Sequence, residues 1–230
     1  MWIDEVSQLQ SAQDVLAEGL SAVVKRDNVS PLSHWILAAW LRGCSPSEMS
    51  IRMPSALASV ATVFLLYLLG RRMFGVSAGL VAAGFVALSP FAIWYAQDGR
   101  MYSLMMCLGA LAMYACWEAS SERGRSRHWV LLAIASAAGV YNHQYALLLG
   151  AALGVYALTC FGLKHRTFWA FAATQLVAAI SFVPWLLVSL ERLRGMAGTP
   201  KAAPLLWLPY AGFTFVYGFS LGPSVRELHW

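Results

Sequence analysis

The stretch "MPSALASVATVFLLYLLG", residues 53–70, decides the fold of this chain. It contains no charged residue, and a helix needs roughly 17–25 largely apolar residues to cross a membrane. Its polar residues do not alternate with period two as they would in a half-buried strand. Because backbone N–H groups in lipid must be satisfied within their own segment or in a closed barrel, the stretch predicts a transmembrane helix.

Similar apolar runs fill most of the remaining chain. The protein is 59% hydrophobic and 12% charged, whereas a soluble domain is about 25% charged. We therefore predict an all-α, polytopic transmembrane helical bundle with about six or seven spans. The further runs lie at 74–95, 101–117, 129–141, 145–163, 168–190 and 205–221.

The first part of the chain has a different character. Residues 4–25 carry a modest apolar stripe at helical spacing, which predicts an amphipathic helix on the membrane surface. Residues 32–41, "LSHWILAAWL", are too short to span, and 42–52 form a polar connector. We therefore divide the chain into a first external loop with amphipathic juxtamembrane helices, residues 1–52, and a transmembrane bundle, residues 53–230.

The positive charges indicate how the bundle is oriented. The net charge of +5 does not form one patch, as nucleic-acid binding would require, but falls in alternate short joints between apolar runs. By the positive-inside rule these joints are cytoplasmic, and the joints between them lie outside. We expect a multi-pass protein of the bacterial plasma membrane. The basic residues are Arg71, Arg72, Arg123, Arg125, Arg127, Lys164 and Arg166.

This orientation has a consequence for the ends of the chain. It places Met1 outside, although no earlier segment is present to carry it across the membrane. We therefore expect the chain to be the N-terminal portion of a longer protein.

Two polar clusters share the predicted outer side. "QDGRMYSLM", residues 97–105, carries Asp98, Arg100 and Tyr102 beside an apolar run, and Asp4 precedes Glu5 near the start. Ionisable groups near membrane depth are costly and are often functional.

Each cluster also has a purely structural explanation. Asp98 and Arg100 could be an interfacial pair between helices, and acidic residues are favoured in the first turn of a helix. His143, in "YNHQY", could be a solvated loop residue, and Arg52 is predicted to extend to the lipid headgroups.

Several short motifs follow one another in the order of a known family. The chain resembles the N-terminal half of bacterial glycosyltransferases of family 39, which have the GT-C fold and include protein O-mannosyltransferases, lipid A aminoarabinose transferases and rhizobial lipopolysaccharide galacturonosyltransferases. One departure is at residues 29–34, "VSPLSH", where relatives usually read His-Pro-Pro-Leu-Tyr-Tyr. The motifs are "WIDE", "SPLSHWILAAW", "IRMPSALASVATVFLLYLLGRRMFG", "LSPFAIWYAQDGRMYSL", "GVYNHQYALLLG" and "PYAGFTFVYGFSLGPSVRELH".

The resemblance implies a function and a set of site residues. Family members move a sugar from a polyprenyl-phosphate carrier to an acceptor on the external face. Asp4 matches the catalytic aspartate of the first loop, and Glu5 matches its companion in that motif. The residues that match the family's donor-binding segments are Asp98, Arg100, Tyr102 and His143.

These residue types suit the implied chemistry. A lipid phosphate leaves readily, but the acceptor hydroxyl needs a carboxylate within hydrogen-bond reach to take its proton. A guanidinium can balance the charge that develops on the phosphate. Asp4 would be the base and Arg100 the phosphate ligand, with inversion at the sugar carbon.

The sequence leaves other possibilities open. No cofactor is required, and no ligand spacing indicates a metal, although a divalent ion is compatible with the acidic residues. The sugar and the glycan, lipid or protein acceptor are not specified. The alternatives are a transporter or flippase for a lipid-linked solute, which would use Asp98 and Arg100 as gating charges, and an inactive glycosyltransferase fragment.

Overall fold

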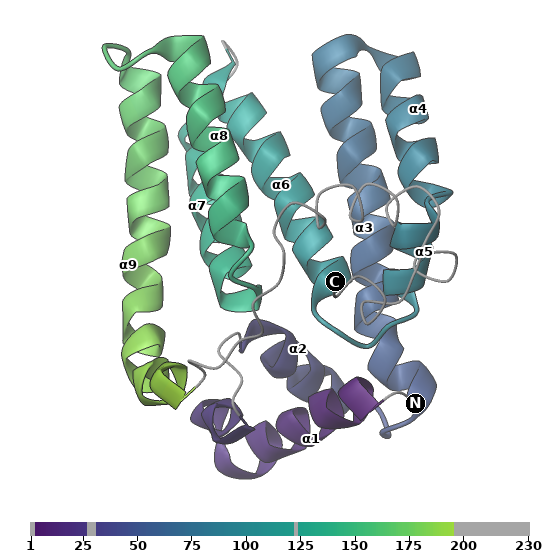
Figure 1. The fold of residues 1–230 in the computed structure, drawn as a ribbon. Coiled ribbons are helices and arrows are strands. Elements are labelled where there is room, and N and C mark those ends of the chain that lie inside the picture. The colour runs from purple at the N-terminus through teal and green to yellow at the C-terminus, as the bar shows by residue number, and fades with distance from the viewer. Residues whose placement is uncertain (1–2, 27–30, 122–123, 196–230) are drawn as a thin grey trace, which may run out of the picture.

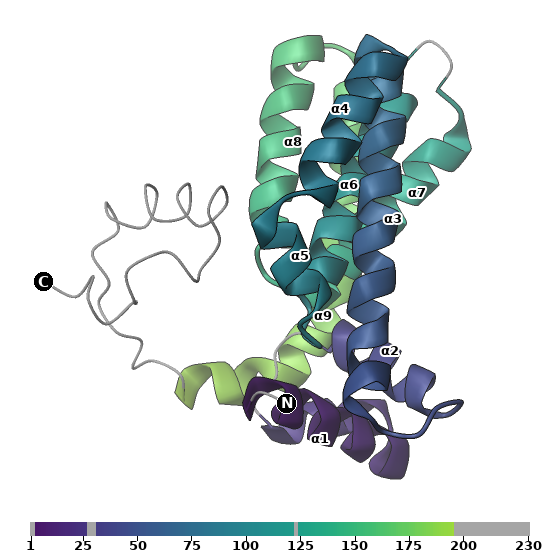
Figure 2. The same ribbon diagram turned by 90° about the vertical axis from the view of Figure 1, so that its right-hand side faces the viewer.

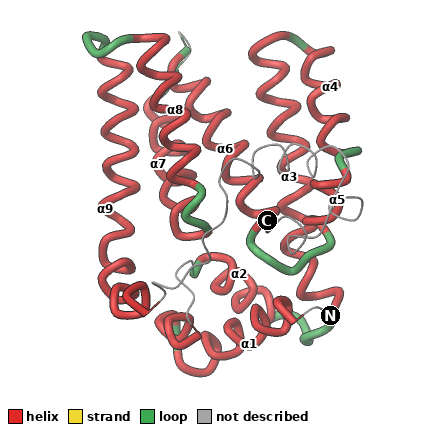
Figure 3. The backbone as a smooth tube through the Cα atoms, viewed as in Figure 1, coloured by secondary structure: helices red, strands yellow, loops and turns green. Residues whose placement is uncertain are grey.

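The described part of the protein is helical throughout. The computed structural model describes residues 3–26, 31–121 and 124–195, and every regular element in these ranges is a helix (Figure 3). This confirms the predicted all-α class. The predicted span at 205–221 and the motif residues Val29 and Ser30 lie outside the described ranges.

Two helices and a short 3₁₀ segment precede the bundle. They are α1 (Ile3–Glu18), the 3₁₀ segment η1 (Leu20–Arg26) and α2 (Leu32–Leu41). The prediction of one continuous helix over 4–25 is wrong, because the chain turns at Gly19, whose φ of 97° lies in the left-handed region that glycine adopts without strain. Figures 1 and 2 show α1 lying across one end of the bundle, the position expected of a surface helix.

Seven further helices make up the rest of the described chain. They are α3 (Glu48–Phe74), α4 (Val76–Ala87), α5 (Pro90–Ala96), α6 (Tyr102–Ser120), α7 (Ser126–Asn142), α8 (Ala146–Phe161) and α9 (Arg166–Gly195).

The α3 helix is longer at both ends than the apolar run that predicted it. It begins in the predicted polar connector, where the Ser47 side chain and that of Ser50 cap each other's backbone N–H groups. It also continues through Arg71 and Arg72, which were expected to form a joint, and ends at Gly75 with φ of 98°. The local caps, and not the hydrophobic boundary, decide where this helix starts and stops.

The run predicted as one span over 74–95 is bent. Its two helices, α4 and α5, differ in direction by 61°. Ser89 caps α5 by accepting a hydrogen bond from the Ala92 N–H at 3.4 Å, and Pro90 occupies the first helical turn, where its missing N–H costs nothing. The bend directs α5 toward the loop that leads into α6.

Several helices are long and apolar enough to cross a membrane. In the described ranges there are three, or up to four if the bent pair α4–α5 counts as one span, whereas α2 and α8 are shorter apolar helices. The chain is therefore a membrane protein with a helical bundle, and the total of six or seven spans stays a prediction.

Small residues allow the central helices to approach closely. Ala112, Ala115 and Cys116 of α6 pack against Leu132 and Ala135 of α7 in one buried cluster. Small side chains are typical of helix contacts inside membranes, where van der Waals packing drives association. A second cluster joins α1, α2, α3 and α9 at the end where α1 lies.

The helix connections of the bundle fall into two groups, one at each end. The α3–α4, α6–α7 and α8–α9 connections lie at one end (Figure 1), and the seven basic residues on which the orientation prediction rests lie at or beside these connections in the sequence. The α1 and α2 helices and the α5–α6 loop lie toward the other end (Figures 1 and 2). Residues 4 and 97–101, far apart in sequence, are thereby brought to the same end.

Candidate functional site

The candidate site is built around the loop of residues 97–101, which joins α5 to α6. This loop meets the first turn of α1, which carries both acidic residues of the "WIDE" motif. Arg100 Nη1 donates a hydrogen bond to Asp4 Oδ2 at 2.9 Å. The tertiary structure therefore joins the two polar clusters that the sequence assigned to one face.

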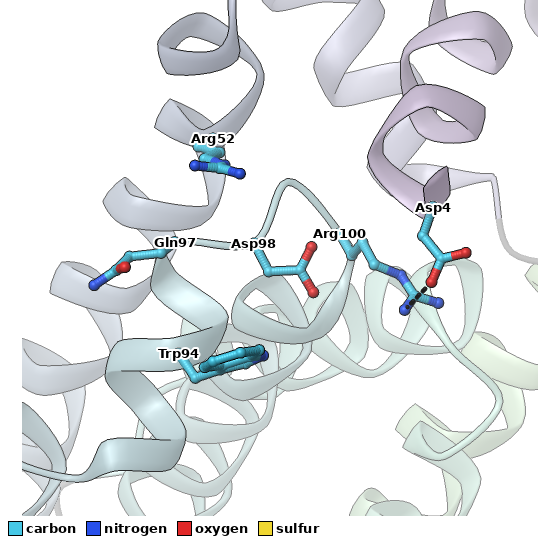
Figure 4. Close-up of a pocket in the computed structure, with 6 residues that line it drawn as sticks. All are labelled: Asp4, Arg52, Trp94, Gln97, Asp98 and Arg100. Atoms are coloured by element: carbon cyan, nitrogen blue, oxygen red, sulfur yellow. Dashed lines mark hydrogen bonds and ion pairs between the residues drawn. The ribbon is translucent and has the colours of Figure 1, made fainter. Parts of the chain in front are cut away.

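A pocket of about 410 Å³ lies at this junction. Figure 4 shows the side chains of Asp98, Arg100 and Asp4 side by side from left to right, with Arg52 above them on the neighbouring α3. Carboxylates, guanidinium groups, an amide and an indole ring all line one cavity, a mixture that can bind an anionic head together with sugar hydroxyls. The lining residues are Asp4, Arg52, Trp94, Gln97, Asp98 and Arg100.

Asp4 and Glu5 face different environments although they are neighbours in sequence. The Asp4 side chain is 62% exposed at the pocket, whereas that of Glu5 is 0% exposed. Glu5 accepts hydrogen bonds from Arg52 Nε at 2.8 Å and Arg52 Nη2 at 3.0 Å, and from the Gly99 N–H at 3.1 Å. Glu5 thus ties α1 to α3 and to the loop, and Asp4 presents its carboxylate to the pocket.

The prediction that Arg52 extends to the lipid headgroups is wrong. Besides its two bonds to Glu5, its Nη2 lies 2.8 Å from Glu48 Oε1 one turn earlier in α3. The buried carboxylate of Glu5 needs a cationic partner, and this need determines the direction of the Arg52 side chain.

Tyr102 and His143 lie beside Arg100 but do not line the pocket. The Arg100 guanidinium carbon is 5.0 Å from the centroid of the Tyr102 ring, a cation–π contact. The Tyr102 ring lies 4.6 Å from that of Tyr95 and 6.2 Å from that of His143, centroid to centroid. The aromatic group supports one side of the guanidinium.

The local environment shifts two titrating groups of the site. Burial raises the pKa of Asp98 above its ordinary value, although the nearby Arg100 charge acts in the opposite direction. Burial, and secondarily the Arg100 charge, lowers the pKa of His143, which favours the neutral imidazole.

Within residues 3–26, 31–121 and 124–195, no group of three or more His, Cys, Asp or Glu residues has the geometry to hold a metal ion.

Three lining residues were missed by the sequence prediction, namely Arg52, Trp94 and Gln97. All three lie inside motifs that carry the family resemblance, "IRMPS" and "WYAQDGR". Their location in these motifs is the feature of the sequence that could have identified them as site residues. Neither composition nor spacing distinguishes Trp94 from the other interfacial tryptophans.

Comparison with known proteins relates the chain to one family. Residues 28–187 match the family described as dolichyl-phosphate-mannose-protein mannosyltransferase. The chain is also similar to the undecaprenyl phosphate-alpha-4-amino-4-deoxy-L-arabinose arabinosyl transferase of Edwardsiella ictaluri (strain 93-146), with 24% identity over 161 residues. That match covers 67% of this chain but only 29% of the relative. No solved structure gives a significant match.

The family match includes α2 to α8 and much of α9, and with them the pocket-lining residues of α3, α5 and the loop. It extends over more than half of the chain, whereas the first motif, "WIDE", with Asp4 and Glu5, and the last motif, at 209–229, lie outside the matched residues. The chain therefore belongs to the dolichyl-phosphate-mannose-protein mannosyltransferase family.

Proposed function

We propose that this protein is a membrane glycosyltransferase that moves a sugar from a polyprenyl-phosphate donor to an acceptor hydroxyl. The observation that carries the proposal is the pocket in which an exposed carboxylate, Asp4, lies 2.9 Å from a guanidinium, Arg100, contributed by a distant loop. The family and the arabinosyl transferase relative, whose name specifies a lipid-phosphate sugar, support the donor class.

The reaction needs two groups that the pocket supplies. The acceptor oxygen attacks the anomeric carbon of the sugar, the bond from that carbon to the phosphate oxygen breaks, and the configuration inverts. Asp4 takes the proton of the acceptor hydroxyl. The lipid phosphate leaves with the bonding electrons, and Arg100 stabilises the resulting charge.

The Asp4–Arg100 ion pair gives the donor a specific way to enter. A phosphate can accept two parallel N–H bonds from a guanidinium, and it would thereby replace Asp4 as the partner of Arg100. The Asp4 carboxylate is then released to accept a hydrogen bond from the acceptor. Because the Asp4 side chain is 62% exposed, this exchange costs little.

The end of the bundle that holds the pocket is opposite to the basic joints. We propose that this end faces outward from the bacterial plasma membrane, as the positive-inside rule requires. The donor would reach the pocket from the lipid, and the acceptor, whose nature is unspecified, from the extracytoplasmic side.

The experiment is a transfer assay with the purified protein in nanodiscs and a labelled polyprenyl-phosphate sugar. We expect Asp4→Asn to lower turnover roughly 10²–10⁴-fold, as loss of a general base does, and Arg100→Ala to lower it roughly 10²–10³-fold, as loss of one charge-stabilising donor does.

Two control variants each remove one charge at a position away from the pocket. Glu18→Gln removes an acid at the far end of α1, and Lys164→Ala removes an exposed base at the α8–α9 joint. Both are expected to keep full turnover. Normal transfer by both pocket variants, or no transfer by the unsubstituted protein, would overturn the proposal. Movement of intact donor across the bilayer without transfer would instead support a flippase.

A further inference from the structure

The backbone of the site loop is held at three successive residues by side chains from three different helices. Glu5 of α1 accepts a hydrogen bond from the Gly99 N–H at 3.1 Å. The Ser55 hydroxyl of α3 donates to the Arg100 carbonyl oxygen at 3.1 Å. The Asn142 amide, at the end of α7, donates to the Met101 carbonyl oxygen at 3.0 Å.

We propose that Glu5, Ser55 and Asn142 form a backbone clamp that positions Asp98 and Arg100 in the pocket. The clamp residues are positioning residues and not catalytic ones, because they bind the loop backbone and do not line the pocket. This inference rests on the proposed function, and it adds an explanation of how the loop that carries Asp98 and Arg100 is held in place.

Burial gives these three bonds their importance. The exposed fractions are 0% for Glu5, 5% for Ser55 and 0% for Asn142. Water cannot replace a lost partner at such positions, so a broken bond leaves a buried polar group unsatisfied. Each bond therefore favours one position of the loop over any displaced position.

The clamp also separates the two faces of the loop. The backbone groups of residues 99–101 are turned to the clamp, whereas the side chains of Asp98 and Arg100 line the pocket (Figure 4). Gly99 is buried in the loop between Asp98 and Arg100. A Cβ at this position would lie 2.8 Å from Ile51 Cγ2. The loop is thus seated directly on α3, with no room for a side chain between them.

Glu5 differs from the other two clamp residues in carrying a charge. Its pairing with Arg52 compensates for burial of the carboxylate and fixes the direction of the oxygen that receives the Gly99 N–H. Successive residues of a helix project about 100° apart. One turn of α1 can therefore present Asp4 to the pocket and Glu5 to the backbone of the loop.

The arrangement matches what catalysis by charge stabilisation needs. A donor aimed at a developing charge is effective when it is held in place before the reaction, because no reorganisation is then required. Arg100 has a long side chain, and the clamp fixes the backbone from which it starts. The cation–π contact with Tyr102 restrains the other end.

The test combines turnover with an observable that does not depend on turnover. In Ser55→Ala and Asn142→Ala, we expect hydrogen–deuterium exchange to become faster in peptides that contain residues 97–102. We expect kcat to fall roughly 10–100-fold, the usual effect of removing a residue that orients a catalytic group. The affinity for undecaprenyl phosphate in nanodiscs should fall as well, because Arg100 is less well placed.

The matched control is Ser103→Ala. Ser103 is also fully buried, near the start of α6, and its hydroxyl has no hydrogen-bond partner in the described part of the chain. This variant should leave loop exchange, kcat and lipid affinity unchanged. If Ser55→Ala and Asn142→Ala behave like Ser103→Ala, the clamp is wrong.

Glu5→Gln separates a positioning role from proton transfer. The substitution keeps an oxygen that can accept the Gly99 N–H but removes the charge. If Glu5 itself takes a proton, this variant should be as inactive as Asp4→Asn while exchange of the peptides that contain residues 97–102 stays as slow as in the parent, and that combination would contradict the clamp.

The remaining outcomes distinguish the clamp from the proposed function. Faster loop exchange with unchanged turnover would show that the bonds exist but do not position the site, which also overturns the inference. Lipid phosphate binding without any sugar transfer by the unsubstituted protein would overturn the proposed function alone, and the clamp would then be judged by loop exchange and lipid affinity.

Discussion

At the level of single residues, the site depends on how burial is distributed among a few charges. Asp4 and Arg100 are paired where solvent can reach them, so their bond can be exchanged for bonds to a substrate. Glu5 is fully buried and paired with Arg52, so the same kind of bond is structural there. This difference in exposure is the reason why the proposed mechanism assigns proton transfer to Asp4 and a structural role to Glu5.

Asp98 allows a prediction about stability and pH. Because burial raises its pKa, the folded protein binds more protons than the unfolded chain at pH values between the two pKa values. The ionised form therefore costs stability at any pH above the folded-state pKa, and this cost disappears as the pH falls to the unfolded value. We expect Asp98→Asn to raise the melting temperature at pH 7 while lowering turnover.

The measurement is thermal unfolding in detergent as a function of pH. The stability gain from Asp98→Asn should shrink as the pH is lowered through the raised pKa, and turnover of the unsubstituted protein should fall over the same range if the ionised form is needed. An Asp98→Asn variant that is less stable than the parent at pH 7 would contradict this account.

At the level of elements, α3 and α4 approach each other closely at two glycines. A Cβ on Gly79 would lie 2.6 Å from the Tyr67 carbonyl oxygen, and one on Gly70 would lie 2.9 Å from the Gly79 Cα. Real Cβ atoms do not approach backbone atoms this closely, so the two helices can pack in this way only with glycine at both positions. This contact holds the α4–α5 pair, and with it the pocket residue Trp94, against α3.

A pair of glycines in the same helix tests this contact. We expect Gly79→Ala to destabilise the protein by about 1–3 kcal/mol, as overpacking does. Gly84→Ala should be neutral or stabilising by up to about 1 kcal/mol, because a Cβ there meets nothing within 4 Å and alanine favours the helix. Thermal unfolding of both variants in the same detergent gives the comparison, and equal effects would show that the α3–α4 contact does not depend on Gly79.

At the level of the whole molecule, the basic residues that predict the orientation lie near the helix connections at one end of the bundle (Figure 1), and the pocket lies at the other. This polarity is what links the proposed site to a compartment. In the proposed reaction all pocket residues must share the side on which the acceptor is found, because the proton and the sugar would be transferred within one cavity.

Cysteine accessibility tests the orientation. In a variant without the four native cysteines, we introduce Gln97→Cys at the pocket or Ser126→Cys at the opposite end; both positions are exposed. On intact cells, a membrane-impermeant maleimide should label the first position only, and permeabilised cells should show labelling of both. Labelling of position 126 alone in intact cells would place the pocket in the cytoplasm and contradict the proposed location.

Much of the fold could be predicted from the sequence because it depends on local hydrophobicity. A run such as 53–70 must form a helix in lipid wherever it packs. The short α2 helix and the break at "YNHQY" between α7 and α8 were confirmed for the same local reason. Helix ends were less predictable, since the Ser47 cap and the turn at Gly19 override the apolar boundaries.

Only the tertiary structure decided how the site is assembled. The sequence, through its resemblance to a family, determined which residues to consider and, through its basic joints, that they share one end of the bundle. It could not determine that Glu5 is buried on Arg52 while Asp4 is exposed, or that Ser55 and Asn142 hold the loop. Burial and hydrogen-bond partners depend on which helices meet, and residues 5, 55, 99 and 142 meet only after the chain has folded.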